Sequence, residues 1–160
     1  MSDTTQIGPL VDRQGLDKVA SHVDDAVRKG ARVIVGGHRR DGLYFDPTVL
    51  VDVTRGMRIL EEETFGPVAP IVGFNDDAEA IRAANATPYG LAAYIWTRDL
   101  GRAFRVAEAL DYGIVGVNDG LPATPHAPFG GVKNSGIGRE GGKWGLEEYL
   151  DVKYISMVLP

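Results

Sequence analysis

The chain has 160 residues, with 17 basic and 22 acidic side chains and a formal net charge of −5 at pH 7. This acidic balance argues against nucleic acid as a partner, because binding a phosphate backbone requires clustered lysine and arginine. No apolar run approaches the roughly 18–20 residues of a membrane span, and residues 1–6 lack the features of a signal peptide. We therefore expect a cytoplasmic protein without a membrane partner.

The chain has no cysteine, which excludes a disulfide framework, a thiolate metal site and a cysteine nucleophile within these residues. Its three histidines, His22, His38 and His126, lie far apart in the sequence without a second ligand type at metal spacing. We expect no metal site, and we expect His22 on the solvent-facing side of a helix.

The first half of the chain predicts one helix followed by extended segments. Apolar residues recur at helical spacing over residues 12–29, and Gly30 is placed to end that helix. A β-branched run over residues 31–37 predicts a strand, and residues 44–53 are expected to be extended, with Pro47 at an edge or a bulge.

The second half alternates strands with helices. Asp76 and Glu79 form a capping-box pattern that predicts a helix to about Ala86, and Asp99 is placed to cap a second helix that ends by Gly113. The inner face of that second helix is predicted to consist of Leu100, Ala103, Phe104, Ala107 and Leu110. Further strands are predicted over residues 67–74, 92–97 and 114–118.

This alternation is typical of an α/β fold with a largely parallel sheet and flanking helices. The end of the chain departs from the pattern. Residues 140–150 predict a helix, and residues 151–159 predict a terminal strand that no helix is left to cover. A strand without a neighbour offers its edge to another chain, so we expect a homo-oligomer.

Two segments carry candidate site residues. In Glu61-Glu62-Glu63-Thr64-Phe65-Gly66-Pro67, three carboxylates can form a solvated turn, or one of them can be held at a strand end beside an aromatic, where α/β folds bind ligands. The second segment, residues 127–140, combines an aromatic, several glycines and charges, which is typical of a site or an interface. Within it, Gly136 to Gly141 spells G-x-G-x-x-G, but no predicted strand directly precedes it, which argues against a dinucleotide fingerprint.

Together these segments resemble the C-terminal third of an aldehyde dehydrogenase, over nearly the whole chain. The succinate-semialdehyde dehydrogenase branch is the most similar, on residues 104–118 and 139–145. The matching motifs are Ile7-Gly8-Pro9-Leu10, Phe45-Asp46-Pro47-Thr48-Val49-Leu50, Glu62-Glu63-Thr64-Phe65-Gly66-Pro67, Tyr89-Gly90-Leu91-Ala92-Ala93, and Pro128-Phe129-Gly130-Gly131-Val132-Lys133 with Ser135-Gly136 and Gly138-Arg139-Glu140. The resemblance implies a partial catalytic domain over residues 1–148 and an oligomerisation strand and tail over residues 149–160.

In that family a cysteine thiolate attacks the aldehyde and hydride passes to NAD or NADP. The resemblance implies that Glu63 holds the nicotinamide ribose and that Phe65 lies beside the nicotinamide. It also implies that Phe129 belongs to the aldehyde tunnel, that residues 120–124 anchor the substrate, and that Tyr149 to Met157 joins subunits.

This chain departs from the family pattern in two ways. The succinate-semialdehyde branch usually presents a serine where this chain has Ala123, so Thr124 or a backbone N–H takes that role, or the substrate differs. The chain also has no cysteine nucleophile and no nucleotide-binding domain, so the coenzyme site is incomplete and no catalytic residue is assigned. Alone, it is expected not to oxidise aldehydes; the alternative is a standalone oligomerisation or partner-binding module without catalysis.

Overall fold

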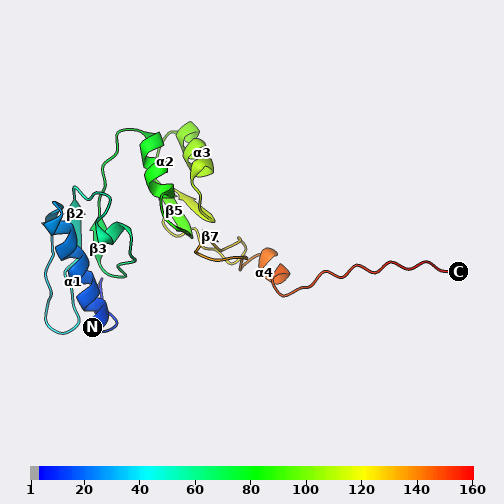
Figure 1. The fold of residues 1–160 in the computed structure, drawn as a ribbon, viewed down its shortest axis with the longest axis horizontal. Helices are drawn as coiled ribbons and strands as arrows, with labels where there is room; N and C mark the ends of the chain where they lie inside the picture. Colours follow the sequence, from blue (N-terminus) through cyan, green and yellow to red (C-terminus); the bar gives the residue numbers. More distant parts are fainter. Residues whose placement is uncertain (1–3) are drawn as a thin grey trace. The chain divides into compact units, whose positions relative to one another are not determined.

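The computed structural model describes residues 4–160, which form two compact units (Figure 1). The first unit ends at Phe74 and the second spans Asn75–Pro160. The structure thus divides the chain at residue 74, and the domain boundary expected at residue 148 stays a prediction.

The first unit is built on the helix α1, Arg13–Arg28, as predicted. The Asp12 side chain accepts a hydrogen bond from the Gly15 N–H at 2.7 Å and so caps its first turn. Gly30, with φ of +106°, ends the helix in the left-handed conformation that glycine adopts without strain. The expectation for His22 was wrong, because its side chain is fully buried on the inner face of α1.

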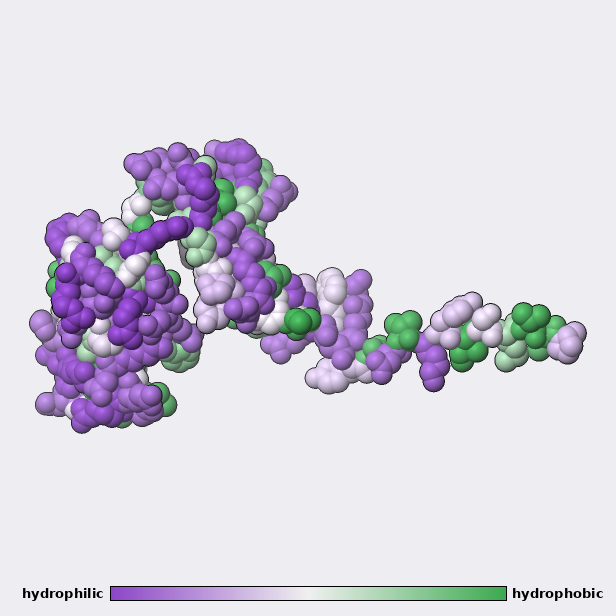
Figure 2. Space-filling model, viewed as in Figure 1, coloured by the Kyte–Doolittle hydropathy of each residue, from purple (hydrophilic) through white to green (hydrophobic). Residues whose placement is uncertain are grey.

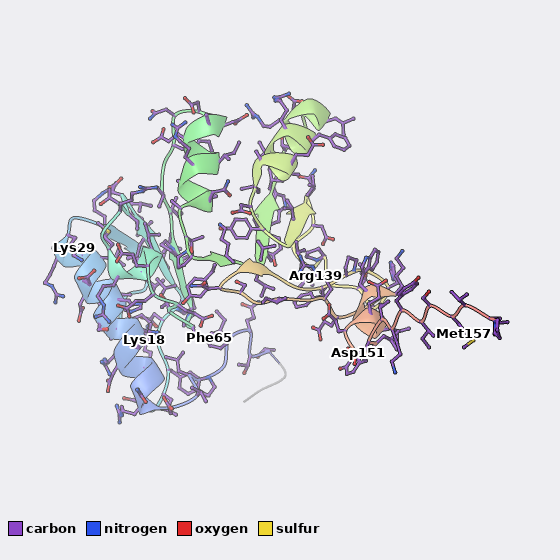
Figure 3. All side chains as sticks on the ribbon, turned by 45° about the vertical axis from the view of Figure 1, so that its right-hand side comes forward. Lys18, Lys29, Phe65, Arg139, Asp151 and Met157 are labelled. Atoms are coloured by element: carbon purple, nitrogen blue, oxygen red, sulfur yellow. The ribbon has the colours of Figure 1, made fainter. Side chains whose placement is uncertain are left out.

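A three-stranded sheet of order β1-β2-β3 packs with this helix, and a 3₁₀ turn, η1, follows β2. Strand β1 pairs antiparallel with β2, with an irregularity between Val33 and Val35, and β2 pairs parallel with β3. The bounds are β1 Arg32–Val35, β2 Thr48–Val51, η1 Arg58–Leu60 and β3 Val68–Pro70. In Figure 3, Lys18 lies on α1 and Lys29 directly follows its last residue.

The hydrophobic core of the described residues lies in this first unit, between α1, the sheet and η1. It consists of Leu16, Val19, Ala20, Val23, Ala26, Ala31, Phe45, Leu50, Val53, Met57 and Ile59. The core therefore fixes the segment after η1, where the acidic candidate residues lie.

Replacing Leu50 by alanine is expected to lower the free energy of unfolding of the first unit by about 2–5 kcal/mol, because the β2 side chain is fully buried and its loss leaves a cavity. Urea unfolding followed by far-ultraviolet circular dichroism measures the change. The exposed Val35 of β1 is the matched control, and Val35→Ala is expected to change stability by no more than about 0.5 kcal/mol. Equal losses in the two variants would contradict the placement of the core.

The second unit contains two separate two-stranded sheets with helices beside them. Strands β4 and β7 pair antiparallel, whereas β5 and β6 pair parallel. The bounds are α2 Asp77–Asn85, β4 Tyr89–Gly90, β5 Ala92–Ile95, α3 Leu100–Ala109, β6 Ile114–Val117, β7 Val132–Lys133 and α4 Trp144–Glu147. Among residues 4–160, no helix is both long and apolar enough to cross a membrane.

Two predicted helix starts are confirmed by their caps. The Asp76 carboxylate accepts from the Glu79 N–H at 2.7 Å, and Glu79 in turn accepts from the Asn75 N–H at 2.8 Å. The Asp99 carboxylate accepts from the Arg102 N–H at 3.0 Å. Local side-chain chemistry therefore sets where α2 and α3 begin.

The α/β class is confirmed, but the largely parallel sheet is wrong. The structure has three small sheets, one of them mixed, because the glycine-containing segment after β1 turns the chain back so that β2 runs antiparallel to β1. The predicted inner face of α3 is also wrong in part: only Ala103 is buried, while Leu100 and Phe104 are exposed.

The end of the chain differs most from prediction. The helix expected over residues 140–150 shortens to the single turn α4, since Gly141 and Gly142 hold positive φ angles that interrupt a helix. Residues 151–160 form no strand, because no neighbouring strand pairs with them in the described chain (Figure 1). Their apolar side chains, such as Val152 and Val158, are exposed (Figure 2).

Candidate functional site

The acidic turn, residues 61–67, connects η1 to β3 in the first unit. One of its three glutamates, Glu62, forms a bidentate ion pair with Arg58. Arg58 Nε lies 2.9 Å from Glu62 Oε1, and Arg58 Nη2 lies 3.2 Å from Glu62 Oε2. Mainly because of the Arg58 guanidinium, and also because of His22, the pKa of Glu62 falls to about 2. Glu62 is thus an ionised anchor at neutral pH.

His22 of α1 lies beneath this turn and contacts it through both ring nitrogens. Nε2 is 3.3 Å from Glu62 Oε2, and Nδ1 is 3.1 Å from Thr64 Oγ1. Burial lowers the pKa of His22, so the ring is neutral at pH 7. Because an ionised carboxylate only accepts, Nε2–H donates to Glu62 and Nδ1 accepts from the Thr64 hydroxyl.

Asp25, one turn further along α1, holds the start of η1. Its carboxylate accepts from the Arg58 backbone N–H at 3.0 Å and from Lys29 Nζ at 3.0 Å. The Arg58 hydrogen bond, followed by that of Lys29, lowers the pKa of Asp25. The segment that carries the acidic turn is therefore attached to α1 at its start and along its length.

The same turn presents Glu63 and Phe65 to solvent. Phe65 is 83% exposed and has φ of +44°, a conformation uncommon for a residue other than glycine. Next to it, a Cβ added at Gly66 would overlap the Val19 side chain, so the turn lies directly on α1. Within residues 4–160, the Glu63 carboxylate has no hydrogen-bond or ion-pair partner. Phe65 is labelled in Figure 3.

The first unit is expected to lose stability as the pH falls. The pKa values of His22, Asp25 and Glu62 are all lower than their ordinary values, so the unfolded chain binds more protons and the free energy of unfolding falls with pH. The loss begins near the ordinary histidine value of 6.5 and continues as Glu62 is protonated between 4.5 and about 2.

Urea unfolding at a series of pH values measures this loss. Glu62→Gln is expected to reduce the loss of unfolding free energy between pH 4.5 and about 2. Glu61→Gln is the matched control, because Glu61 has no side-chain partner within the described residues. Stability that rises on acidification would contradict this electrostatic account.

The second unit contains the glycine-rich loop, residues 128–142. Its two ends are joined at a β-bridge: the Phe129 N–H donates to the Glu140 carbonyl at 2.7 Å, and the Glu140 N–H donates to the Phe129 carbonyl at 2.8 Å. Arg139, labelled in Figure 3, donates from Nη1 to the Gly131 and Gly138 carbonyls at 2.8 and 2.7 Å. The Phe129 side chain is half-buried in this closed loop.

Lys133 attaches the loop to the helices. It has φ of +55°, and its Nζ lies 3.2 Å from Asp111 Oδ2 and donates to the Asn85 carbonyl at 3.2 Å, at the end of α2. The ammonium also lies 5.4 Å from the centre of the Tyr112 ring. Like Phe65, Lys133 has a positive φ, and its ammonium links the loop to the ends of α2 and α3.

A shallow cleft of about 530 Å³ opens on the glycine-rich loop, and Phe129, Arg139 and Tyr149 are among its lining residues. Ala123 and Thr124 do not line it, and both are exposed. Of the five sequence-predicted site residues, the structure thus places Glu63 and Phe65 on one turn of the first unit. The other three lie in the second unit, with Phe129 alone in the cleft.

Sequence reasoning missed the residues that hold the acidic turn, above all His22 and Glu62. Their contact joins positions 40 residues apart, which local patterns do not reveal. A signal was present, since His22 falls at helical spacing from the buried Val19 and Ala26 and so belongs to the inner face of α1.

The chain thus presents an exposed carboxylate and an exposed aromatic on the acidic turn, and a further aromatic in the cleft on the glycine-rich loop. Residues 1–155 match the Aldehyde dehydrogenase family. This chain belongs to the aldehyde dehydrogenase family. The exposed positions Glu63 and Phe65 and the cleft residue Phe129 all fall within the matched residues of this aldehyde dehydrogenase chain.

The most similar relatives include enzymes named for semialdehydes. The chain is 54% identical over 155 residues to succinate-semialdehyde dehydrogenase [NADP(+)] GabD of Escherichia coli, covering 96% of this chain and 32% of that protein. It is 52% identical to glutarate-semialdehyde dehydrogenase of Pseudomonas putida, covering 98% of this chain and 33% of the relative.

Solved structures of aldehyde dehydrogenase relatives have the same fold. A crystal structure of an E. coli NADP dependent enzyme superposes with a TM-score of 0.95 at 52% identity, covering 99% of this chain and 34% of that chain. Betaine aldehyde dehydrogenase from Staphylococcus aureus, in complex with NAD+, gives a TM-score of 0.87 at 45% identity over 93% of this chain and 31% of that chain.

The placement of this aldehyde dehydrogenase chain at the C-terminal third of such an enzyme requires correction and is not retained. The family match begins at residue 1 of this chain and covers residues 1–155. The relatives establish only that the shared stretch amounts to about a third of their length. The chain spans about a third of the length of the curated relatives that it matches.

Proposed function

We propose that this chain contributes coenzyme- and aldehyde-contacting residues to an NAD(P)-dependent aldehyde dehydrogenase, with succinic semialdehyde, oxidised to succinate, as the best substrate. Family membership supports oxidation of an aldehyde. The names of the relatives from E. coli and P. putida support a short aldehyde that carries a carboxylate at its other end.

The observation that carries the proposal is the presentation of Phe65 and Glu63 on the acidic turn. An exposed aromatic held at a positive φ gives a flat apolar face, which suits a nicotinamide ring. A carboxylate with unused lone pairs suits the paired hydroxyls of a ribose. These side chains fit the nicotinamide half of NAD(P), which when bound supplies the hydride acceptor.

We assign the aldehyde contacts to Phe129, Ala123 and Thr124. Phe129 supplies an apolar wall in the cleft on the glycine-rich loop. Thr124 offers a hydroxyl to a substrate carboxylate, a role that Ala123 lacks the polar group to perform. The Thr124 carbonyl accepts from the Ala127 N–H at 3.2 Å, which orders the backbone of this segment.

These 160 residues contain no cysteine, so they supply no thiolate nucleophile. We therefore expect no aldehyde-dependent reduction of NAD+ or NADP+ by the 160-residue chain alone. Spectrophotometric assay with succinic semialdehyde measures this, and turnover above a protein-free blank would show that the chemistry lies elsewhere in the chain.

The positive test uses a chimera, in which this chain replaces the stretch of the E. coli relative that it matches. Because the two sequences are 54% identical, the replacement is expected to fold. We expect the chimera to oxidise succinic semialdehyde with NADP+. A folded chimera that reduces no coenzyme with any short semialdehyde would contradict the proposed function.

A second candidate is an oligomerisation or partner-binding module formed by Tyr149 to Met157. The exposed aromatic and aliphatic side chains of this segment favour it, including Tyr149, Val152 and Tyr154. We propose that the segment adds as a strand to another copy of the chain. Light scattering is expected to show dimers or larger assemblies for the native chain and smaller species for Ile155→Pro, which removes a ladder donor. A monomeric native chain would exclude this role.

A further inference from the structure

The acidic turn is held from below by one buried side chain, His22, which contacts the residues on either side of Glu63. Its two ring nitrogens contact Glu62 and Thr64, at 3.3 and 3.1 Å. Residues 62 and 64 flank the exposed Glu63, and residue 64 directly precedes Phe65. Glu63 and Phe65 therefore alternate along the turn with Glu62 and Thr64, whose side chains contact His22 of α1.

The ionised state of Glu62 determines which ring nitrogen of His22 donates and which accepts. With Nε2–H donating to Glu62, the remaining lone pair of Nδ1 accepts only from the Thr64 hydroxyl. The hydrogen bond that the Thr64 hydroxyl donates to the buried ring fixes one rotamer of Thr64, and Arg58 Nε donates to Glu62 from the solvent side at 2.9 Å. Both neighbours of Glu63 are thus restrained: Thr64 by His22, and Glu62 by His22 and Arg58.

The restraint is needed because the backbone of Phe65 is not in its preferred conformation. A non-glycine residue at φ of +44° persists only where its surroundings determine it. On one side, Gly66 is packed on Val19. On the other side, Thr64, which directly precedes Phe65, is held by its hydroxyl contact with His22 at 3.1 Å.

We propose that His22 is a positioning residue, which holds Thr64 and Glu62 so that Phe65 and Glu63 face the nicotinamide nucleotide. The inference rests on the proposed function for the identity of the ligand, but the positioning itself concerns only this chain. His22 touches neither coenzyme nor aldehyde in this account; it acts through the turn.

The first test is independent of enzymatic activity and uses the 160-residue chain. Nuclear magnetic resonance measures the backbone order parameter of Phe65 and its HN–Hα coupling, which reports φ. In His22→Leu and in Thr64→Val, which keeps the shape but not the hydroxyl, we expect a lower order parameter and a coupling that moves toward that of negative φ. Unchanged values in both variants would overturn the proposal.

Two further variants separate positioning from general stability. Leu16→Ala removes a buried side chain from the same helix without a hydrogen bond to the turn, and it is expected to lower stability while leaving the Phe65 coupling unchanged. His22→Asn places a polar atom near the position of Nδ1 and is expected to restore part of the native coupling. If Leu16→Ala moved the coupling as much as His22→Leu does, the role of His22 would be structural only.

The second test uses the chimera. Thr64→Val is expected to raise the KM for the coenzyme about fivefold, the effect of about one lost hydrogen bond, with the KM for the aldehyde unchanged. The double variant His22→Leu, Thr64→Val is expected to be no worse than His22→Leu alone, because the two residues act through one contact. Additive effects would overturn the proposal.

The two tests distinguish a failure of the positioning role from a failure of the proposed function. If the Phe65 coupling responds to His22 but the coenzyme KM of an active chimera does not, the turn is positioned as proposed and its assignment to the coenzyme is wrong. If the chimera is inactive, the proposed function fails, and the resonance measurement still decides the positioning role.

Discussion

Glu63→Gln is expected to raise the KM of the chimera for NADP+ by about tenfold to a hundredfold, with a smaller effect on kcat. The substitution keeps the size of the side chain but replaces a charged acceptor by a neutral amide. Hydrogen bonds to charged groups contribute about 1.5–3 kcal/mol, and each 1.4 kcal/mol corresponds to about a factor of ten in affinity. Steady-state kinetics with the coenzyme varied at saturating aldehyde measure the effect.

The chain offers a matched control at Glu61, two residues earlier in the same acidic run. Glu61 is also exposed and has no side-chain partner within the part of the chain that the structure describes. Glu61→Gln is therefore expected to leave the coenzyme KM within about twofold of the native value, a change below about 0.5 kcal/mol. Equal increases for both variants would indicate a general effect of charge and contradict a specific contact at Glu63.

Gly113→Ala is expected to destabilise the second unit by about 2–3 kcal/mol and to displace the glycine-rich loop. A Cβ at Gly113 would overlap the Gly130 carbonyl oxygen and lie 2.9 Å from the Gly131 Cα, and both are backbone atoms that cannot rotate away. Overpacking of this kind costs about 1–3 kcal/mol. Because Phe129 precedes Gly130, the chimera variant is also expected to have a higher KM for the aldehyde.

Both tryptophans, Trp96 and Trp144, lie in the second unit, so tryptophan fluorescence during urea unfolding reports on that unit alone. Gly101→Ala in α3 is the control: its Cβ would meet mainly the flexible end of Arg105, and alanine is favoured over glycine in a helix by about 0.5–1 kcal/mol. We expect opposite signs for the two substitutions. A neutral Gly113→Ala would show that Gly130 and Gly131 do not lie against Gly113.

The features that sequence predicted well are local ones. Asp76 and Asp99 cap their helices through hydrogen bonds to N–H groups three residues later, so the signal and the contact share one short segment. Sheet pairing is not local, because whether β2 runs parallel or antiparallel to β1 depends on how residues 36–47 turn. The sequence pattern accordingly predicted β1, β2, β3, β5 and β6, but not β4, β7 or the antiparallel pairs β1–β2 and β4–β7.

The candidate site likewise combines residues that local motifs predicted with residues that they missed. Glu63, Phe65 and Phe129 were predicted from motifs of consecutive residues, and such motifs are what the family resemblance is based on. The residues around them were missed because several of their contacts join distant positions: His22 and Glu62 are 40 residues apart, and Lys133 and Asn85 are 48 apart. The predicted terminal strand is absent for a different reason. Strand pairing requires a second strand, and residues 151–160 have no such neighbour in the described chain.

The central claim is that the acidic turn of this chain binds the nicotinamide half of the coenzyme. A crystal structure of the chimera with NADP+ bound tests it most directly. The account predicts the Glu63 carboxylate within about 3.2 Å of the ribose hydroxyls, with the Phe65 ring against the nicotinamide. A well-ordered nicotinamide ribose that contacts neither side chain would contradict it.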